Sequence, residues 1–192
     1  MSRIIDLTLP LENGLRGISI EPVRTVAKDG WSTTTLHLYS HGGTHMDAPT
    51  HFGVTDETID RIPVDKLIGP AWVADLSGVA PRALIGVDAL GATAGRVRPG
   101  DGLLLRTDWS RRFREPAWRD ELPRVSLELA QWCVERGVRI LGVEPPSVAD
   151  VSSRDELTRV HTALLGGGVI IVEGLANLDD DDRSEEHTSE LQ

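Results

Sequence analysis

The chain has 192 residues, of which 40% are hydrophobic, and this is enough for one domain with a buried core. Its formal net charge of −10 disfavours nucleic acid or an anionic membrane as a partner. No apolar run approaches the roughly 18 residues of a membrane-spanning helix, and no charged-then-apolar leader is visible. The sequence therefore favours a cytoplasmic location.

The N-terminal stretch is predicted to be poor in regular structure. Residues 4–9 are typical of a short strand, and residues 11–28 of a loop-rich stretch with weak strand signals. Residues 33–39 alternate, with Leu36 and Leu38 on one face and polar side chains on the other. This alternation predicts a half-buried strand that leads into the next segment.

The middle of the chain is predicted to alternate strands with helices or loops. Residues 56–67 are expected to form a loop with a short helical turn, residues 71–76 a strand and residues 83–90 a helix followed by a loop. The continuous apolar run over residues 102–107 is typical of a buried strand. Trp109 follows that strand, and it either walls a pocket or packs in the core or at an interface.

Further along, the sequence predicts two helices and a buried strand between them. Ser126 is a good N-cap for the first helix, in which Cys133 is expected to be a buried hydrophobe rather than a nucleophile. Residues 138–143 predict a strand ending at Glu144, whose carboxylate either shapes a pocket floor or stabilises a turn. Residues 154–165 predict the second helix.

Residues 41–52 hold three of the six histidines together with a carboxylate. These side chains share sequence parity, so an extended chain would project them to one side, and Gly42, Gly43 and Pro49 would curl the segment. Imidazole nitrogen and carboxylate oxygen suit Zn²⁺, Mn²⁺ or Fe²⁺, whereas a single cysteine excludes a thiolate site. The alternative is a polar loop with hydrogen-bonded histidines. The candidate ligands are His41, His45, Asp47 and His51.

The segment resembles the signature of the cyclase family of metal-dependent hydrolases, His-x-Gly-Thr-His-x-Asp-x-Pro-x-His, at every fixed position. The similarity extends from residues 5–8 to residues 173–178. Members include bacterial-type kynurenine formamidase and isatin hydrolase. The resemblance implies a swivelling β/β/α-type α/β domain with a mixed, barrel-like sheet and flanking helices, which forms homodimers or homotetramers.

The resemblance also implies the roles of the clustered residues. It assigns His41 and His45 to one metal, Asp47 to a bridge between two metals, and His51 to general acid/base catalysis. His37 shares their parity but is not part of the motif. We therefore expect it to be a strand residue or a support for the ligands.

The rest of the metal site is expected near the end of the chain. Glu173 closes the apolar strand predicted over residues 169–172, where a carboxylate requires a cation or a strong donor. On spacing alone, His161 would be an ordinary helix histidine. In the family, however, a histidine followed twelve residues later by a glutamate completes the site, and His161 with Glu173 reproduces that interval. By resemblance, His161 binds the second metal and Glu173 bridges both.

The implied activity is hydrolysis of a small amide, formamide, lactam or ester by an arylformamidase-like enzyme. Two Zn²⁺ ions, or Mn²⁺, would activate water, and His51 would move the proton. The alternative is a metal-binding module without activity, or a fragment disabled by truncation. His51 favours the enzyme, because a pure binding site needs no further imidazole. Kynurenine formamidases usually carry a Trp-Pro-Gly-Asp-like element where residues 14–17 read Gly-Leu-Arg-Gly, so the substrate stays open.

The end of the chain differs in composition from the rest. Residues 1–178 are expected to form the hydrolase domain and residues 179–192 an acidic tail. Residues 183–192 match the translation of a common sequencing-library adapter, so we expect the reading frame to run into adapter and the domain to be truncated. The alternative is a genuine disordered tail. We expect residues 183–192 to pack against nothing, and an unpaired sheet edge or an exposed apolar strip to lie near residues 169–172.

Overall fold

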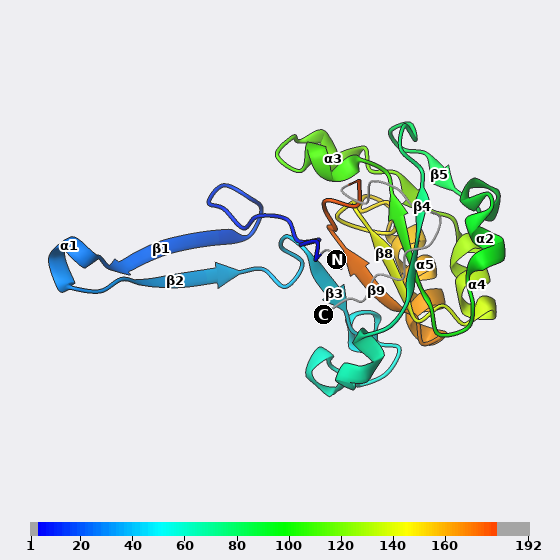
Figure 1. Ribbon diagram of the computed structural model, residues 1–192, viewed down its shortest axis with the longest axis horizontal. Helices are drawn as coiled ribbons and strands as arrows, with labels where there is room; N and C mark the ends of the chain where they lie inside the picture. Colours follow the sequence, from blue (N-terminus) through cyan, green and yellow to red (C-terminus); the bar gives the residue numbers. More distant parts are fainter. Residues whose placement is uncertain (1–3, 180–192) are drawn as a thin grey trace.

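The computed structural model describes residues 4–179. Its body is a five-stranded sheet in the order β3-β9-β8-β6-β4. Helices α4 (Leu127–Arg136) and α5 (Arg154–Gly166) lie on one side of this sheet (Figure 1). The strands are β3 (His45–Asp47), β4 (Ala71–Asp75), β6 (Gly102–Arg106), β8 (Ile140–Val143) and β9 (Ile170–Glu173).

The sheet is mixed because β3 alone runs against its neighbour. The strands β4, β6, β8 and β9 are parallel, and β3 pairs with β9 in the antiparallel sense. β3 and β4 form the two edges, and within residues 4–179 they do not pair with each other. The predicted mixed α/β domain is confirmed, but the sheet is open rather than barrel-like.

Burial on both faces explains the continuous apolar runs of the parallel strands. Leu103 and Leu105 pack in the main core with the helices, whereas Leu104 points to the opposite face. There Leu175 and Leu178 cover it. The segment that follows β9 thus closes the side of the sheet that lacks the two long helices.

Both predicted helices are confirmed, as is the predicted N-cap Ser126, and Ser153 caps the second helix. The Ser126 hydroxyl accepts a hydrogen bond from the amide of Leu129 at the start of α4, and the Ser153 hydroxyl accepts one from Glu156 at the start of α5. Cys133 is fully buried in α4, and burial raises the pKa of its thiol to about 12. This thiol is therefore a packing group, as predicted.

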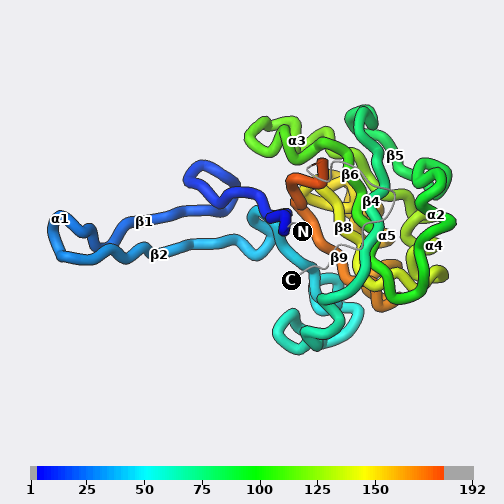
Figure 2. The backbone as a smooth tube through the Cα atoms, viewed as in Figure 1, coloured from blue at the N-terminus to red at the C-terminus, as the bar shows by residue number. Residues whose placement is uncertain are grey.

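A two-stranded arm projects away from the body (Figures 1 and 2). It consists of β1 (Ile18–Arg24), the short helix α1 (Val26–Asp29) and β2 (Thr33–Leu38), with the two strands antiparallel. Every residue of β2 is exposed, including Leu36 at 54% and Leu38 at 52%. The prediction of a half-buried strand was wrong, because the alternating pattern forms a ribbon that no other layer within residues 4–179 covers.

Two predictions of local structure were also wrong. Residues 4–9 form no strand, and only Thr8 makes an isolated bridge to Leu175. The helix predicted over residues 83–90 is instead a short strand followed by a 3₁₀ turn, because Gly86 enters the turn in an extended conformation. These elements are β5 (Leu84–Ile85), which pairs in parallel with β7 (Arg124–Val125), and η4 (Val87–Leu90).

The remaining elements are single turns at the rim of the sheet. Residues 56–67 contain two 3₁₀ turns where a loop with one short helical turn was predicted, and the loop expected after residue 90 contains a short helix. None of the helices in the described range has the length and apolar character needed to span a bilayer. The turns are η1 (Pro49–Phe52), η2 (Ile59–Arg61), η3 (Val64–Leu67), α2 (Thr93–Arg96), η5 (Trp109–Arg112) and α3 (Ala117–Asp120).

The end of the described chain differs from expectation at β9. This strand lies between β3 and β8 and is buried, so the unpaired edge predicted near residues 169–172 was wrong. Asp179, the first residue of the expected tail, accepts a hydrogen bond of 2.7 Å from Arg111. Residues 180–192, which include the adapter-like segment 183–192, lie outside the described residues.

Candidate metal centre

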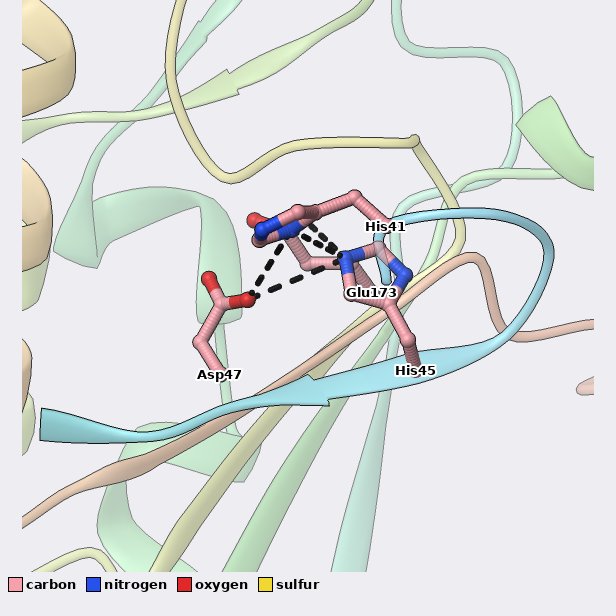
Figure 3. Close-up of side chains that lie close together, drawn as sticks. All are labelled: His41, His45, Asp47 and Glu173. Atoms are coloured by element: carbon pink, nitrogen blue, oxygen red, sulfur yellow. Dashed lines mark hydrogen bonds and ion pairs between the residues drawn. The ribbon is translucent and has the colours of Figure 1, made fainter. Parts of the chain in front are cut away.

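The site is built on the antiparallel pair β3–β9. His45 lies directly opposite Glu173 in this register, and His45 Nε2 is 3.3 Å from Glu173 Oε2. Asp47 lies two residues further along β3 and therefore on the same face. Figure 3 shows these side chains converging with His41. Strand pairing thus joins the histidine-rich segment to the carboxylate at the end of β9.

The loop before β3 curls back as the glycines predict. His41 Nδ1 lies 3.0 Å from His45 Nε2 and 3.3 Å from Asp47 Oδ1. The loop lies close against the end of β9 because Gly174 has a φ of 70° and no side chain. A Cβ at Gly174 would lie 2.7 Å from the Gly43 carbonyl oxygen, so the approach requires glycine.

Two further histidines reach the same cluster from other elements. His161, on α5, places its Nε2 3.5 Å from both Asp47 Oδ2 and Glu173 Oε1. The ring of His51, on η1, lies 4.3 Å from that of His41 and 5.9 Å from that of His161. The structure therefore brings together all six residues singled out in the sequence.

Backbone carbonyls orient two of the imidazoles. His45 Nδ1 lies 3.0 Å from the Gly43 carbonyl oxygen, and His161 Nδ1 lies 2.8 Å from that of Leu157. A proton on each Nδ1 satisfies these carbonyls, so each Nε2 faces Glu173, where it can donate as an imidazolium or, once deprotonated, offer its lone pair to a cation. Histidines that bind metals are commonly held in this way.

Two carboxylates are buried within the cluster. Burial alone would raise the pKa of Glu173, but hydrogen bonds from His161 and His45 outweigh it and hold that pKa well below its usual range. Burial by itself would lower the pKa values of His45 and His161. The hydrogen bonds and the charge of Glu173 outweigh that effect, so both pKa values are raised. The backbone amide of Val148 also donates to Glu173 Oε1 at 2.8 Å.

Asp47 differs from Glu173 because no donor satisfies it. Its side chain is completely buried, and neither Oδ1 nor Oδ2 has a hydrogen-bond partner in the described part of the chain. The nearest groups are histidine nitrogens, 3.3 Å from Oδ1 and 3.5 Å from Oδ2. A buried carboxylate without hydrogen bonds is costly, whereas a divalent cation would satisfy both oxygens. The residues present therefore fit a metal ion.

The potential ligand atoms fall into two sets, each within 4.8 Å of one another. Both sets contain Asp47, and their nitrogen and oxygen donors suit Zn²⁺, Mn²⁺ or Fe²⁺. Because His51 appears in the second set, its position allows either a ligand or a proton carrier. One set is His41, His45, Asp47 and Glu173, and the other is Asp47, His51 and His161.

A cavity of about 500 Å³ opens beside the cluster. His51, His161 and Glu173 of the cluster line it, together with the exposed residues Arg16 and Tyr39. This volume lies within the range of small-molecule sites, about 300–1,000 Å³. A small substrate could therefore reach the ligand cluster.

Other candidate residues lie outside the centre. His37 is exposed on the arm, with its Nε2 3.8 Å from Glu21 Oε2. Trp109 is buried and donates its indole N–H to the Trp118 carbonyl at 2.8 Å, so it belongs to the core rather than to the cavity wall.

Glu144 stabilises a turn and does not line the cavity. Its buried carboxylate accepts hydrogen bonds from the amides and hydroxyls that follow β6. Burial raises the pKa of Glu144, and the four donors oppose that shift. The donors are Thr107 N, Thr107 Oγ1, Trp109 N and Ser110 Oγ.

Some groups that support the centre are backbone atoms and were not predictable from the sequence. The Leu157 carbonyl and the Val148 amide carry no side-chain signal. Phe52, whose ring stacks on His161 at 4.4 Å, and Tyr39, whose ring lies 5.4 Å from that of His41, could have been noticed as aromatic residues next to candidate ligands. Arg16 had a signal too, because it stands in the departure from the kynurenine formamidase pattern.

Comparison with known proteins relates this centre to a family. Residues 5–150 match the family model named Cyclase and described as "Putative cyclase". The chain belongs to the cyclase family. A kynurenine formamidase from Salinibacter ruber (strain DSM 13855 / M31) is 33% identical over 144 residues, which cover 73% of this chain and 63% of that relative. The match thus spans less than two thirds of the curated relative.

Solved structures share the fold of this cyclase-family chain. Isatin hydrolase A from Labrenzia aggregata, bound to benzyl benzoate, superposes with a TM-score of 0.82 at 24% identity, over 93% of this chain and 82% of that one. Isatin hydrolase A from Ralstonia solanacearum gives a TM-score of 0.81 at 25% identity, over 93% of this chain and 81% of that one. The fold is therefore that of the isatin hydrolases.

Proposed function

We propose that the protein is a metal-dependent, arylformamidase-like hydrolase that cleaves a small amide, formamide, lactam or ester. The observation that carries this proposal is the buried carboxylate of Asp47, which has no donor in the described chain and lies where two ligand sets meet. The adjacent cavity gives a substrate access. The names of the relatives, kynurenine formamidase and isatin hydrolase, support the same class of reaction.

We assign the metal ligands from the distances in the cluster. His41 and His45 would hold the first metal and His161 the second, while Asp47 and Glu173 lie close to both groups and would contribute to each. Two Zn²⁺ ions per chain fit these donors, and Mn²⁺ is an alternative. When bound, such ions lower the pKa of water and polarise a carbonyl group.

His51 is the proposed general acid/base. It is exposed on η1 while its ring faces His41, so it can exchange protons with both solvent and a bound substrate. Burial lowers its pKa, as do the charges of His41 and His161, while Asp47 opposes them. A neutral imidazole can accept a proton from water and then donate it to the departing nitrogen or oxygen.

Metal analysis combined with a substrate screen tests the proposal. The protein is stripped with a chelator and refilled with Zn²⁺ or Mn²⁺, and the metal content is measured by mass spectrometry. Aryl formamides, lactams and aryl esters are then tested for hydrolysis. About two metals per chain, with activity that disappears on stripping and returns on refilling, would support the hydrolase. Metal binding without hydrolysis would favour a binding module, and absence of binding would reject both.

We further propose that the protein is a cytoplasmic homodimer or homotetramer. The reducing environment of the cytoplasm suits a chain with one buried cysteine. A projecting hairpin with exposed apolar residues supports association, because such surface is otherwise left in water. Light scattering on the purified protein tests the oligomeric state. The exposed apolar residues of the arm are Val23, Val26, Trp31, Leu36 and Leu38.

A further inference from the structure

Three arginines line the cavity of a chain whose net charge is −10. They are Arg16, Arg114 and Arg119, none of which belongs to the ligand cluster. Guanidinium groups that line one cavity of an acidic protein favour the approach of an anion. An arginine is available to an anionic ligand when no carboxylate of the protein already pairs with it.

Two of the three arginines already have carboxylate partners. Arg114 holds Glu12 in a two-pronged ion pair, with Nη2 3.0 Å from Oε2. Arg119 reaches its neighbour Asp120 at 3.5 Å. Arg16 has no carboxylate partner among residues 4–179, and its guanidinium lies over the Tyr39 ring at 5.7 Å. Arg16 is therefore the available cation.

The backbone holds Arg16 in this position. Gly17 adopts a φ of 71°, and its carbonyl accepts a hydrogen bond of 2.8 Å from the Tyr39 amide. A Cβ at Gly17 would clash with the Cβ of Tyr39, so glycine permits the close approach. The turn is tied further by the Ile18 amide, which donates to the Leu15 carbonyl at 3.1 Å.

The Arg16–Tyr39 pair leads directly to the ligand cluster. The Tyr39 ring lies 5.4 Å from that of His41, which in turn lies 4.3 Å from that of His51. One end of this row is a cation and the other is the proposed reaction centre. A ligand that spans it needs a negative charge at one end and a hydrolysable group at the other, with an aromatic ring between them against Tyr39.

We infer that Arg16 is a specificity-determining residue that binds the carboxylate of an aromatic substrate, with the hydrolysable group directed to the metals. A guanidinium fork matches a carboxylate in geometry and charge, and its stack on Tyr39 orients it in advance. This inference rests on the proposed hydrolase function for the identity of the reacting group. The binding preference itself does not depend on turnover.

The experiment compares two ligands in a binding assay that needs no catalysis. The probes are para-aminophenylpropanoate, which is the anionic amine product of an aryl formamide, and para-propylaniline, its neutral analogue. Calorimetry gives the Kd of each for the metal-loaded protein and for Arg16→Met. We expect the wild-type protein to prefer the anion by about tenfold, and Arg16→Met to lose that preference. Arg16→Lys should keep part of it, because charge remains without the fork.

The matched control is Arg159→Met, which removes an equally exposed arginine of α5 that does not line the cavity. It should leave the preference unchanged. Equal binding of the two probes to the wild-type protein, no binding of either, or a preference that survives in Arg16→Met would overturn the inference. If the anion is preferred but the corresponding formamide is not hydrolysed, the proposed function fails while the role of Arg16 stands.

Discussion

The hydroxyl of Thr44 donates to the carbonyl of Gly174 at 2.5 Å, across a sequence separation of 130 residues. The same oxygen accepts a hydrogen bond of 2.8 Å from the Leu9 amide. One side chain thus fixes the loop of the first histidines to the end of the strand that carries Glu173. The arrangement of the ligands depends on this contact between two short loops.

Replacing Thr44 with valine should loosen this connection. The change keeps the shape of the side chain but leaves the Leu9 amide and the Gly174 carbonyl without their partner, which should cost about 1–3 kcal/mol of unfolding free energy. Urea denaturation measures the loss, and calorimetry should show weaker metal binding. The control is Thr35→Val on the exposed strand β2, for which we expect almost no change. Equal stability of the two variants would contradict the structural role of Thr44.

The Asp47 carboxylate accepts no hydrogen bond in the described chain, so we expect Asp47→Asn to change stability in opposite directions without and with metal. In a chelator, Asp47→Asn should be more stable than the wild-type protein, because it removes a buried charge near Glu173. In saturating Zn²⁺ the order should reverse, because the wild-type protein alone gains the full binding energy. Thermal unfolding under both conditions measures this. If the wild-type protein were the more stable one in chelator, Asp47 would be satisfied without metal. Asp88→Asn, at an exposed position, is the control for the same chemical change.

The role of His51 is tested by its removal. His51→Ala should retain its metal while turnover falls by roughly 10²–10⁴, the usual contribution of a positioned general acid/base. The exposed histidine of the arm provides a matched control, since His37→Ala should retain both metal and turnover. Loss of one metal in His51→Ala would instead make His51 a ligand, as its membership of the second set allows.

Glu144 should contribute to stability and not to metal binding. In Glu144→Gln, an NH2 group replaces one of the two acceptor oxygens, so the donors that faced this oxygen lose their acceptor. The loss should lower the unfolding free energy by about 2–3 kcal/mol. Metal content should stay that of the wild-type protein. Glu135→Gln, at an exposed position of α4, is the control for the same chemical change. A stable Glu144→Gln variant that loses metal would require a different account.

The sequence contained most of the site because four of its six residues lie within eleven positions. Their spacing placed them on one loop, but it could not show that His45 faces Glu173, since β3 has only three residues and too little pattern to reveal a strand. The buried strands β6 and β8 were predictable from their continuous apolar runs, which only a two-sided core requires. The family resemblance supplied His161, which spacing alone left as an ordinary helix residue.

The arm could not be predicted as an arm. Leu36 and Leu38 follow the alternation of a strand with one buried face, and the sequence of a single chain does not say whether another layer covers that face. The cavity entrance was hidden for a different reason. Arg16 precedes the first strand of the hairpin, and Tyr39 follows the second strand, 23 residues later. Only the pairing of Ile18 with Leu38 at the base of the hairpin brings them together.

The hairpin of β1 and β2 is expected to fold and unfold independently of the sheet. In the described part of the chain its strands pair only with each other, and Ile18 and Leu38 at its base lie close in sequence, so it can form early and locally, before the body assembles. By the same token it can separate without unfolding the sheet. Its amide hydrogens should exchange with solvent through local opening, orders of magnitude faster than those of β6 and β8, whose exposure requires the whole core to come apart. Arg16 and Tyr39, which line the cavity, therefore border a segment that can unfold alone. The ligand cluster lies beside the sheet, which unfolds only with the whole core.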